Sequence, residues 1–489
     1  MNNSLFKTKS LDKLLSESQE TGEHSLKRAL GRLNLVTLGI GAIIGAGIFV
    51  LTGNAAANYA GPAVVISFIV AGLACTFAGL CYAEFASMIP IAGSAYTYSY
   101  ATLGEFIAWI IGWDLILEYL FGASTVAVGW SGYVVSFFAD FGIHIPLSMA
   151  NSPFTFNPAT GEWSSTGALL NFPAVFIVAV MTTLLVIGIK ESANMNNIIV
   201  IIKVVVILLF IAFGINYVNA DNWEPFFKPQ AENDTFWHYG WGGVFRAAGI
   251  IFFAYIGFDA VSTAAQESKN PQKDMPYGIL GSLFVCTIIY IFVGFVMTGI
   301  VEFPKLNDPA PVAVAVNAAG EGLTWLRYPI KIGAIAGLSS VILVMLMGQP
   351  RIFFSMSQDG LLPKSFSKIH PKFKTPHITT IITGAVAAII AGLFPIGILG
   401  ELVSIGTLLA FLLVSGGILV LRYKQPNINR PFKAPWFPLT PVLGVLTSFA
   451  VMLMLPFDTW MRLLVWMALG FAIYFGYGRK HSALLTNAK

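Results

Sequence analysis

Long apolar segments, separated by polar connections, dominate this sequence. Of its 489 residues, 56% are hydrophobic and only 11% are charged, whereas soluble domains carry about 25% charged residues. About twelve segments reach the length of roughly 20 apolar residues that a helix needs to cross a bilayer. They begin near Leu33, Ala63, Glu105, Leu170, Asn196, Gly243, Tyr277, Tyr328, His377, Glu401, Pro438 and Trp460. We therefore expect an all-α polytopic membrane protein with about twelve transmembrane helices.

Lys and Arg residues gather on alternate connections between these segments. They occur in the N-terminal tail, after the sixth, eighth and tenth segments, and in the C-terminal tail. The loop 140–169, which falls on the opposite side, contains no Lys or Arg. Because positively charged loops remain in the cytoplasm, the pattern predicts a multi-pass protein of the cell membrane with both termini in the cytoplasm.

Glycines interrupt two of the apolar segments at related positions. GAIIGAGIF interrupts the first segment, and FFAYIGFDA, residues 252–260, interrupts the sixth. Interrupted helices at matching positions of two halves are typical of the central site of a transporter. The spacing predicts two five-helix repeats, a pair of appended helices and two polar tails. Their bounds are 1–32 (tail), 33–215 and 216–425 (repeats), 426–480 (appended helices) and 481–489 (tail).

The first interruption offers backbone groups to a ligand. If the helix unwinds, the N–H groups of Gly45, Ala46 and Gly47 are freed at the start of a half-helix, where an anion such as a carboxylate is favoured. The carbonyls at the end of the preceding half-helix, around residues 40–43, would favour a cation such as an ammonium. Close helix packing is the alternative explanation for these glycines, and the second interruption favours a site.

Ionisable residues within the apolar segments are further candidates, because charges are costly at that depth. Asp259 follows the second interruption and is a candidate for proton coupling or for holding helix ends together. Lys203 would cost about 2.5–3.5 kcal/mol on insertion scales if it lay unpaired in the bilayer. It either extends toward the cytoplasm or lies within the bundle, where it supports the first helix or exchanges protons. Asp114 and Glu118 share a helix face, so Glu118 is a candidate partner for Lys203 or part of an ordinary polar stripe.

Several classes of function are not indicated. The sequence contains no nucleophile elbow, no phosphate-binding glycine loop followed by Lys and no Cys/His metal spacing, so we expect no enzyme, metal site or cofactor. The net charge of +4 and the basic segment 350–376 fit a cytoplasmic loop better than a nucleic-acid site. The absence of a nucleotide-binding domain argues against transport driven by ATP within this chain.

Six stretches resemble motifs of the amino acid–polyamine–organocation superfamily and, within it, the bacterial members of the cationic amino acid transporter family. They are LGIGAIIGAGIFVLTG, AGLCYAEFASMIPIAGSAYTY, GWDLILEY, FFAYIGFDAVSTAAQESKNPQKDMPYGI, GQPRIFFSMSQDGLLP and RPFKAPWFP. The resemblance runs from about residue 30 to about residue 480. It implies the leucine-transporter fold, with two inverted five-helix repeats and a substrate between broken helices 1 and 6.

The resemblance also implies roles for backbone groups at both interruptions. By position, the donors to a substrate carboxylate fall on Ala46 and Gly47. The acceptors for a substrate ammonium fall on the carbonyls of Ile43, Ala254 and Ile256. These are the two stretches that the glycine pattern indicates without the resemblance.

Three side chains also acquire roles by resemblance. Phe253 matches an aromatic wall of the substrate site. Lys203 matches a lysine that replaces a sodium ion in proton-dependent members, and Glu118 matches an acid of the third helix. The resemblance therefore implies a proton as the coupling ion.

These observations predict a secondary active transporter of L-amino acids that uses alternating access. Bacterial members of the family often prefer neutral amino acids, and only Glu118 offers an acid for a cationic substrate, so we expect proton symport of neutral amino acids such as alanine. Uptake of arginine or lysine, amino-acid exchange and amino-acid sensing without transport are the alternatives. The expected partners are the small-molecule substrate and the lipid bilayer, and the pattern leaves small membrane-protein partners open.

Overall fold

The structure is a computed structural model of the chain, and it describes residues 4–9, 30–89, 94–157, 162–188, 193–230, 236–373 and 375–486. Most of the predicted N-terminal tail, 1–32, and the last residues of the predicted C-terminal tail lie outside these ranges. Each of the twelve predicted apolar segments contains helix.

The first half of the chain begins with a broken helix. It comprises α2 (Arg32–Ile43), a π-helical stretch (Gly47–Leu51) and α3 (Thr52–Ala55), which continues through Ala56–Ala60. The helices that follow are α4 (Val64–Met88), α5 (Ser94–Thr102), α6 (Glu105–Ala139), α8 (Phe172–Ile187) and α9 (Ala193–Gly214). The sequence sets the bounds of α8, because the Asn171 side chain accepts a hydrogen bond from the Ala174 N–H and Gly188 ends the helix in the left-handed conformation.

The second half contains another broken helix and four long or intermediate ones. The broken helix comprises α10 (Gly240–Ile251) and two 3₁₀ segments, Phe252–Tyr255 and Asp259–Glu267. The later helices are α11 (Pro271–Ile300), α13 (Thr324–Gln358), α14 (His377–Leu393) and α15 (Ile396–Lys424). The short α12 (Pro311–Ala318) precedes α13. The chain ends with α16 (Leu439–Leu453), α17 (Phe457–Ile473), α18 (Arg479–His481) and α19 (Ala483–Thr486).

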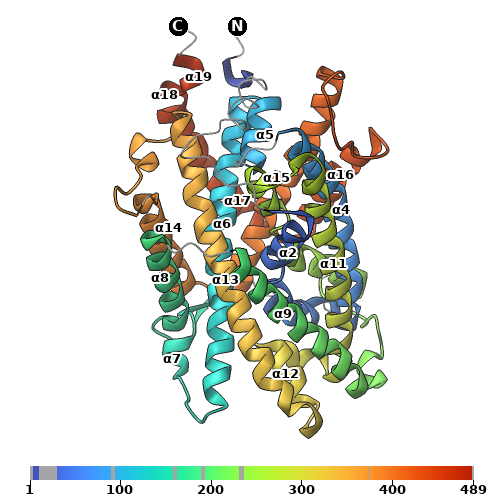
Figure 1. Ribbon diagram of the computed structural model, residues 1–489. Helices are drawn as coiled ribbons and strands as arrows, with labels where there is room; N and C mark the ends of the chain where they lie inside the picture. Colours follow the sequence, from blue (N-terminus) through green and yellow to red (C-terminus); the bar gives the residue numbers. More distant parts are fainter. Residues whose placement is uncertain are drawn as a thin grey trace.

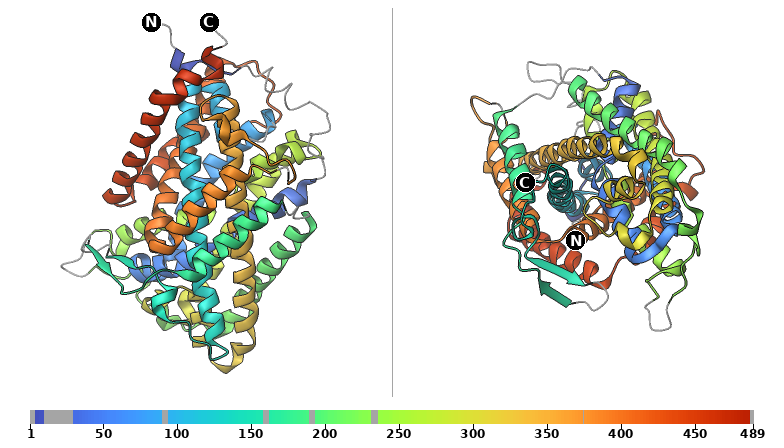
Figure 2. Two further views of the ribbon diagram at one scale, coloured as in Figure 1. Left: turned by 90° about the vertical axis from the view of Figure 1, so that its left-hand side faces the viewer. Right: turned by 90° about the horizontal axis from the view of Figure 1, so that it is seen from below.

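The connection between α6 and α8 adds a short α7 (Leu147–Ala150) and a β-hairpin to the expected helical architecture. Strand β1 (Phe154–Asn157) pairs antiparallel with β2 (Glu162–Ser165), with Phe154 opposite Ser165. The hairpin projects from the side of the helical bundle (Figure 2).

Eight helical stretches in the described ranges are long and apolar enough to cross a membrane, and four apolar helices are shorter. The short ones are α2, α8, α14 and α16. Together these helices make the chain a multi-pass membrane protein, and the count of twelve spans stays a prediction.

Helices α6 and α13, each of 35 residues, pack side by side and run along the bundle (Figure 1). On the other side, α2 and α4 both pack against α11. The ends of the described chain meet at one end of the molecule, where the Lys7 ammonium donates to the Leu484 carbonyl over 3.2 Å. This placement is consistent with termini on one side of the membrane.

Candidate functional site

The first helix breaks at the predicted glycine stretch. Helix α2 ends at Ile43, and the backbone of Ile44 is extended, with φ −72° and ψ 100°. Helical structure resumes at Gly47, after Ala46. The N–H groups at the start of the new segment have no preceding turn to donate to, and their use by a ligand stays a prediction.

The sixth apolar segment breaks within FFAYIGFDA. Ile256 is extended, with ψ 134°, and Gly257 adopts a φ of +118°, which side-chain-bearing residues rarely adopt. The N–H of Gly257 donates to Oδ1 of Asp259 over 3.3 Å. Asp259 is buried and is the first residue of the second 3₁₀ segment, where a negative charge is favoured. This geometry supports the alternative that Asp259 holds helix ends together. The role of Asp259 in proton coupling stays a prediction.

The two breaks touch each other through their backbones. A Cβ added to Gly47 would stand 2.2 Å from the Cα of Ala254, and one added to Gly257 would stand 2.8 Å from the carbonyl of Ala42. Only glycine permits such close approach. The interruption in the first helix therefore lies directly against the interruption in the sixth.

Tyr290 of α11 joins the two breaks, and the sequence reasoning missed it. Its hydroxyl lies 3.0 Å from the Ile43 carbonyl oxygen and 2.9 Å from that of Ala254. A single hydroxyl proton serves one of these oxygens at a time. Two of the three carbonyls predicted to bind an ammonium therefore converge on one donor. A tyrosine within the apolar run CTIIYIFVG was the available signal, because a buried hydroxyl normally has a partner.

Lys203 of α9 lies inside the bundle and does not extend to the cytoplasm. Its side chain is fully buried, and its Nζ donates to the carbonyls of Gly41 over 2.5 Å and Ile44 over 2.9 Å. These carbonyls lack the next helical turn because the helix ends there. The lysine thus supports the broken first helix, which is one of the two roles that the sequence suggested.

The predicted pairing of Lys203 with Glu118 is wrong. Both residues lie in the described ranges, and the ammonium contacts backbone carbonyls instead of that carboxylate. Glu118 is buried on α6 and faces Thr407 of α15. Asp114, one turn earlier, is also buried and lies against Gly406 of the same helix. The two acids therefore lie at the α6–α15 interface, and the role of Glu118 in ion coupling stays a prediction.

The surroundings of the breaks are largely apolar. The side chain of Val341 on α13 lies 3.3 Å from the position of a Cβ on Gly45. Phe253, the predicted aromatic wall, is only 5% exposed and lies within the hydrophobic core. Across the described ranges, no group of three or more His, Cys, Asp and Glu residues is placed to hold a metal ion.

This arrangement provides donors and acceptors for two opposite charges a short distance apart. Free N–H groups at residues 45–47 suit an anion, and the carbonyls of Ile43 and Ala254 suit a cation. All of these groups belong to the backbone, so the arrangement could bind a zwitterion whatever side chain it carries.

Comparisons with known proteins show what this chain is similar to. A family model described as "Amino acid permease" matches residues 30–473. A Bacillus subtilis protein named branched-chain amino acid permease BcaP is 50% identical over 485 residues, which cover 99% of this chain and all of the relative. The Bacillus subtilis methylthioribose transporter is 47% identical over 98% of this chain and 99% of its own length. The Arabidopsis thaliana vacuolar cationic amino acid transporter 4 is 37% identical, over 87% of this chain and 68% of the relative.

Proposed function

Since this chain belongs to the amino acid permease family, we propose that it is a proton-coupled symporter of neutral L-amino acids such as alanine. The observation that carries this proposal is the convergence of the Ile43 and Ala254 carbonyls on one point beside the free N–H groups that follow Ile44. The carbonyls would receive the ammonium of the substrate, and the N–H groups would receive its carboxylate. The Ile256 carbonyl would complete the set of acceptors.

The apolar surroundings support a neutral substrate. Val341 and Phe253 offer no charge to a substrate side chain, and Glu118 faces Thr407 on another interface. Burying a cationic side chain without a partner is costly. A relative named for branched-chain amino acids also favours uncharged side chains, whereas the plant relatives named for cationic amino acids keep arginine and lysine as the rival substrates.

The position of Lys203 supports coupling to protons. Its ammonium donates to the carbonyls of Gly41 and Ile44, which lie in and just after the last turn of α2. A change in the protonation of this group would change how firmly the break is held. Sodium coupling is the rival, and it would require an ion where the lysine lies.

Alternating access would require one group of helices to move against another. We propose that the chain has twelve spans with cytoplasmic termini, arranged as two inverted five-helix repeats, with the first, second, sixth and seventh spans rocking against the third to fifth and the eighth to tenth. In support, α2 and α4 pack on α11, whereas α6 packs on α13 and α15.

A second candidate substrate is methylthioribose. A relative of 47% identity that extends over nearly the full length of both chains carries that name. This compound has neither a carboxylate nor an ammonium, so it would leave the groups at both breaks without charged partners. The geometry therefore favours an amino acid.

Uptake measurements on the purified chain in proteoliposomes test the proposal. Radiolabelled alanine, leucine, arginine and methylthioribose are offered with and without an inward proton gradient, in buffers with and without sodium. We expect alanine and leucine to accumulate only with the proton gradient. Accumulation that depends on sodium would contradict proton coupling, and accumulation of methylthioribose or arginine alone would contradict the substrate assignment. Counterflow without a gradient would indicate an exchanger, and binding without flux would indicate a sensor.

A further inference from the structure

Helix α15 is joined by buried ion pairs, near its two ends, to two helices of the opposite group. It packs on α6 along much of its length and contacts α4 and α10 less extensively. Glu401 lies near the first end of α15, and Arg422 lies near the second. In the orientation proposed above, the first end faces outward and the second faces the cytoplasm.

The outer ion pair joins α15 to the outer half of the broken sixth segment. Nη2 of Arg246, on α10, lies 2.8 Å from Oε1 of Glu401, and the two side chains are 6% and 11% exposed. The other carboxylate oxygen accepts a hydrogen bond from Thr459 of α17 over 2.8 Å and lies 3.7 Å from Arg462. Arg246 also donates to the Met454 carbonyl over 3.2 Å.

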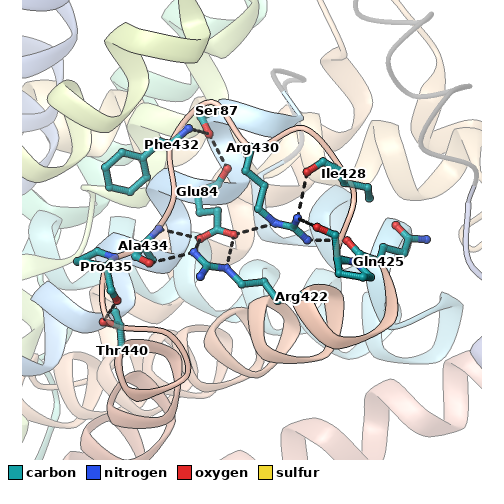
Figure 3. A network of polar contacts seen from close by, with 11 residues as sticks. Glu84, Ser87, Arg422, Gln425, Ile428, Arg430, Phe432, Ala434, Pro435 and Thr440 are labelled. Carbon is teal, nitrogen blue, oxygen red and sulfur yellow. Dashed lines mark hydrogen bonds and ion pairs between the residues drawn. The ribbon is translucent and has the colours of Figure 1, made fainter.

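The inner ion pair joins α15 to α4. Glu84 is fully buried, and Nε of Arg422 donates to its Oε1 over 2.9 Å, with a second contact from Nη2 (Figure 3). Nε of Arg430, in the connection after α15, lies 3.3 Å from the same carboxylate. The N–H of Ala434 donates to Glu84 over 2.8 Å. Glu84 therefore links α4 to α15 and to the connection that follows α15.

We propose that these two ion pairs are the alternating gates of the transport cycle: Arg246–Glu401 opens when the outer path opens, and Glu84–Arg422 opens when the inner path opens. This inference rests on the alternating access proposed above. Both pairs are formed in the structure, and the two breaks lie against each other. On this proposal, the structure is the state in which both gates are closed.

The energetics of buried ion pairs explain why such contacts suit gates. A buried pair gains little over apolar packing because both charges lose their hydration. Opening a water-filled path returns that hydration, so each pair separates at moderate cost. Removing the arginine of a pair weakens the attraction that holds the buried acid against the neighbouring helix, and the open, hydrated state on that side then becomes more favourable. Loss of one pair should consequently bias the chain toward one side only.

Cys81 of α4 is a native reporter of the inner side. It lies one helical turn before Glu84, is fully buried, and faces Ser415 of α15. Separation of α4 from α15 at the inner end would expose this thiol. Cys75, farther along α4 from that end, is also buried and reports unfolding.

The test compares the N-ethylmaleimide alkylation rates of Cys81 in Arg422→Gln and Arg246→Gln, measured in the full chain by mass spectrometry. Arg422→Gln should raise the Cys81 rate by about tenfold, and Arg246→Gln should lower it below the unmodified rate. Arg351→Gln is the matched control, because Arg351 is exposed and its only described hydrogen bond is to the Met347 sulfur; it should leave the rate unchanged. Arg422→Lys, which keeps the positive charge, should keep the rate near that of the unmodified chain.

Opposite effects of the two variants distinguish gates from simple structural contacts. Equal increases in both variants, or no change in either, would overturn the proposal. An increase at Cys75 would show unfolding, and Arg422→Lys would then decide, because failure to keep Cys81 protected in a variant that retains the positive charge counts against the gate. The alkylation needs no substrate, so reciprocal effects in a chain without amino-acid uptake would refute the proposed function and leave the gates intact. Amino-acid uptake without reciprocal effects on the Cys81 rate would refute the gates and leave the proposed function intact.

Discussion

Gly47 lies so close to Ala254 that a Cβ on the glycine would stand 2.2 Å from the Cα and 2.4 Å from the Cβ of the alanine. The atoms it would meet are backbone and the first side-chain carbon, which cannot turn away as a flexible side-chain end can. The two interrupted helices can therefore approach this closely only because residue 47 carries a hydrogen atom in place of a side chain. This contact makes the glycine at residue 47 a requirement of the site itself.

We expect Gly47→Ala to reduce amino-acid uptake strongly and Gly47→Val to abolish it, with membrane insertion retained. The added carbon would push the breaks apart and displace the carbonyl of Ala254 from Ile43. Gly397→Ala is the matched control, because nothing lies within 4 Å of a Cβ at that position. Uptake in proteoliposomes and the amount of protein in the membrane are the measurements. Normal uptake by Gly47→Val would refute the site.

Lys203→Ala should abolish the response of uptake to a proton gradient. The substitution removes both hydrogen bonds to the broken helix, at Gly41 and Ile44, together with the only buried ammonium described there. Lys305→Ala, in an exposed pair with Glu302, serves as the control and should retain the response. Initial rates at a series of imposed pH gradients provide the measurement, and an unchanged gradient dependence in Lys203→Ala would exclude this lysine as the coupling group.

The positions of the two helix breaks could be predicted from the sequence because glycine leaves a local signal. Gly45, Gly47 and Gly257 lie in otherwise apolar segments, and the structure places breaks at both stretches. The side-chain partners could not be predicted in the same way. Tyr290 is 33 residues from the second break, and its hydroxyl reaches that break only because α11 packs against α2 and the sixth segment.

The predicted pairing of Lys203 with Glu118 is wrong for a related physical reason. The sequence offers Glu118 as a partner for Lys203, since opposite charges in apolar segments are expected to meet. A helix break, however, also supplies carbonyls without hydrogen bonds, and these satisfy an ammonium equally well. Arg246 is a lone arginine in the stretch GGVFRAAGII, and such a charge in an apolar segment indicates a buried partner. In the structure that partner is Glu401.

Tyr290→Phe should raise the KM for amino-acid uptake about fivefold to thirtyfold, which corresponds to about 1–2 kcal/mol. Without the hydroxyl, the carbonyls of Ile43 and Ala254 lose the donor that aligns them. Tyr82→Phe is the control, because the buried Tyr82 hydroxyl has no hydrogen-bond partner among the described residues. A lower KM in Tyr290→Phe would show that the hydroxyl competes with the substrate and does not position its ligands.

Asp140, at the end of α6, stabilises the packing of α6 against α13. Its side chain is 5% exposed and accepts hydrogen bonds from Arg327 and, over 2.6 Å, from Lys331. Lys331 is only 1% exposed and also donates to the Ser136 carbonyl. Although burial acts to raise the pKa of Asp140, the hydrogen bonds and charges of Arg327 and Lys331 outweigh it and lower that pKa below its ordinary value.

Asp140→Asn should therefore lower the free energy of unfolding by about 3 kcal/mol at neutral pH, because it removes the carboxylate that pairs with the buried Lys331 ammonium. A lowered folded-state pKa means that the carboxylate stabilises the protein above its unfolded pKa of about 3.9 and ceases to do so as the pH falls through the folded value. The difference in melting temperature between the unmodified chain and Asp140→Asn should thus be constant above about pH 5 and shrink below about pH 4. Asp458→Asn, an exposed residue in the first turn of α17, provides the control in detergent. A difference that grows on acidification would contradict the assigned role of the carboxylate.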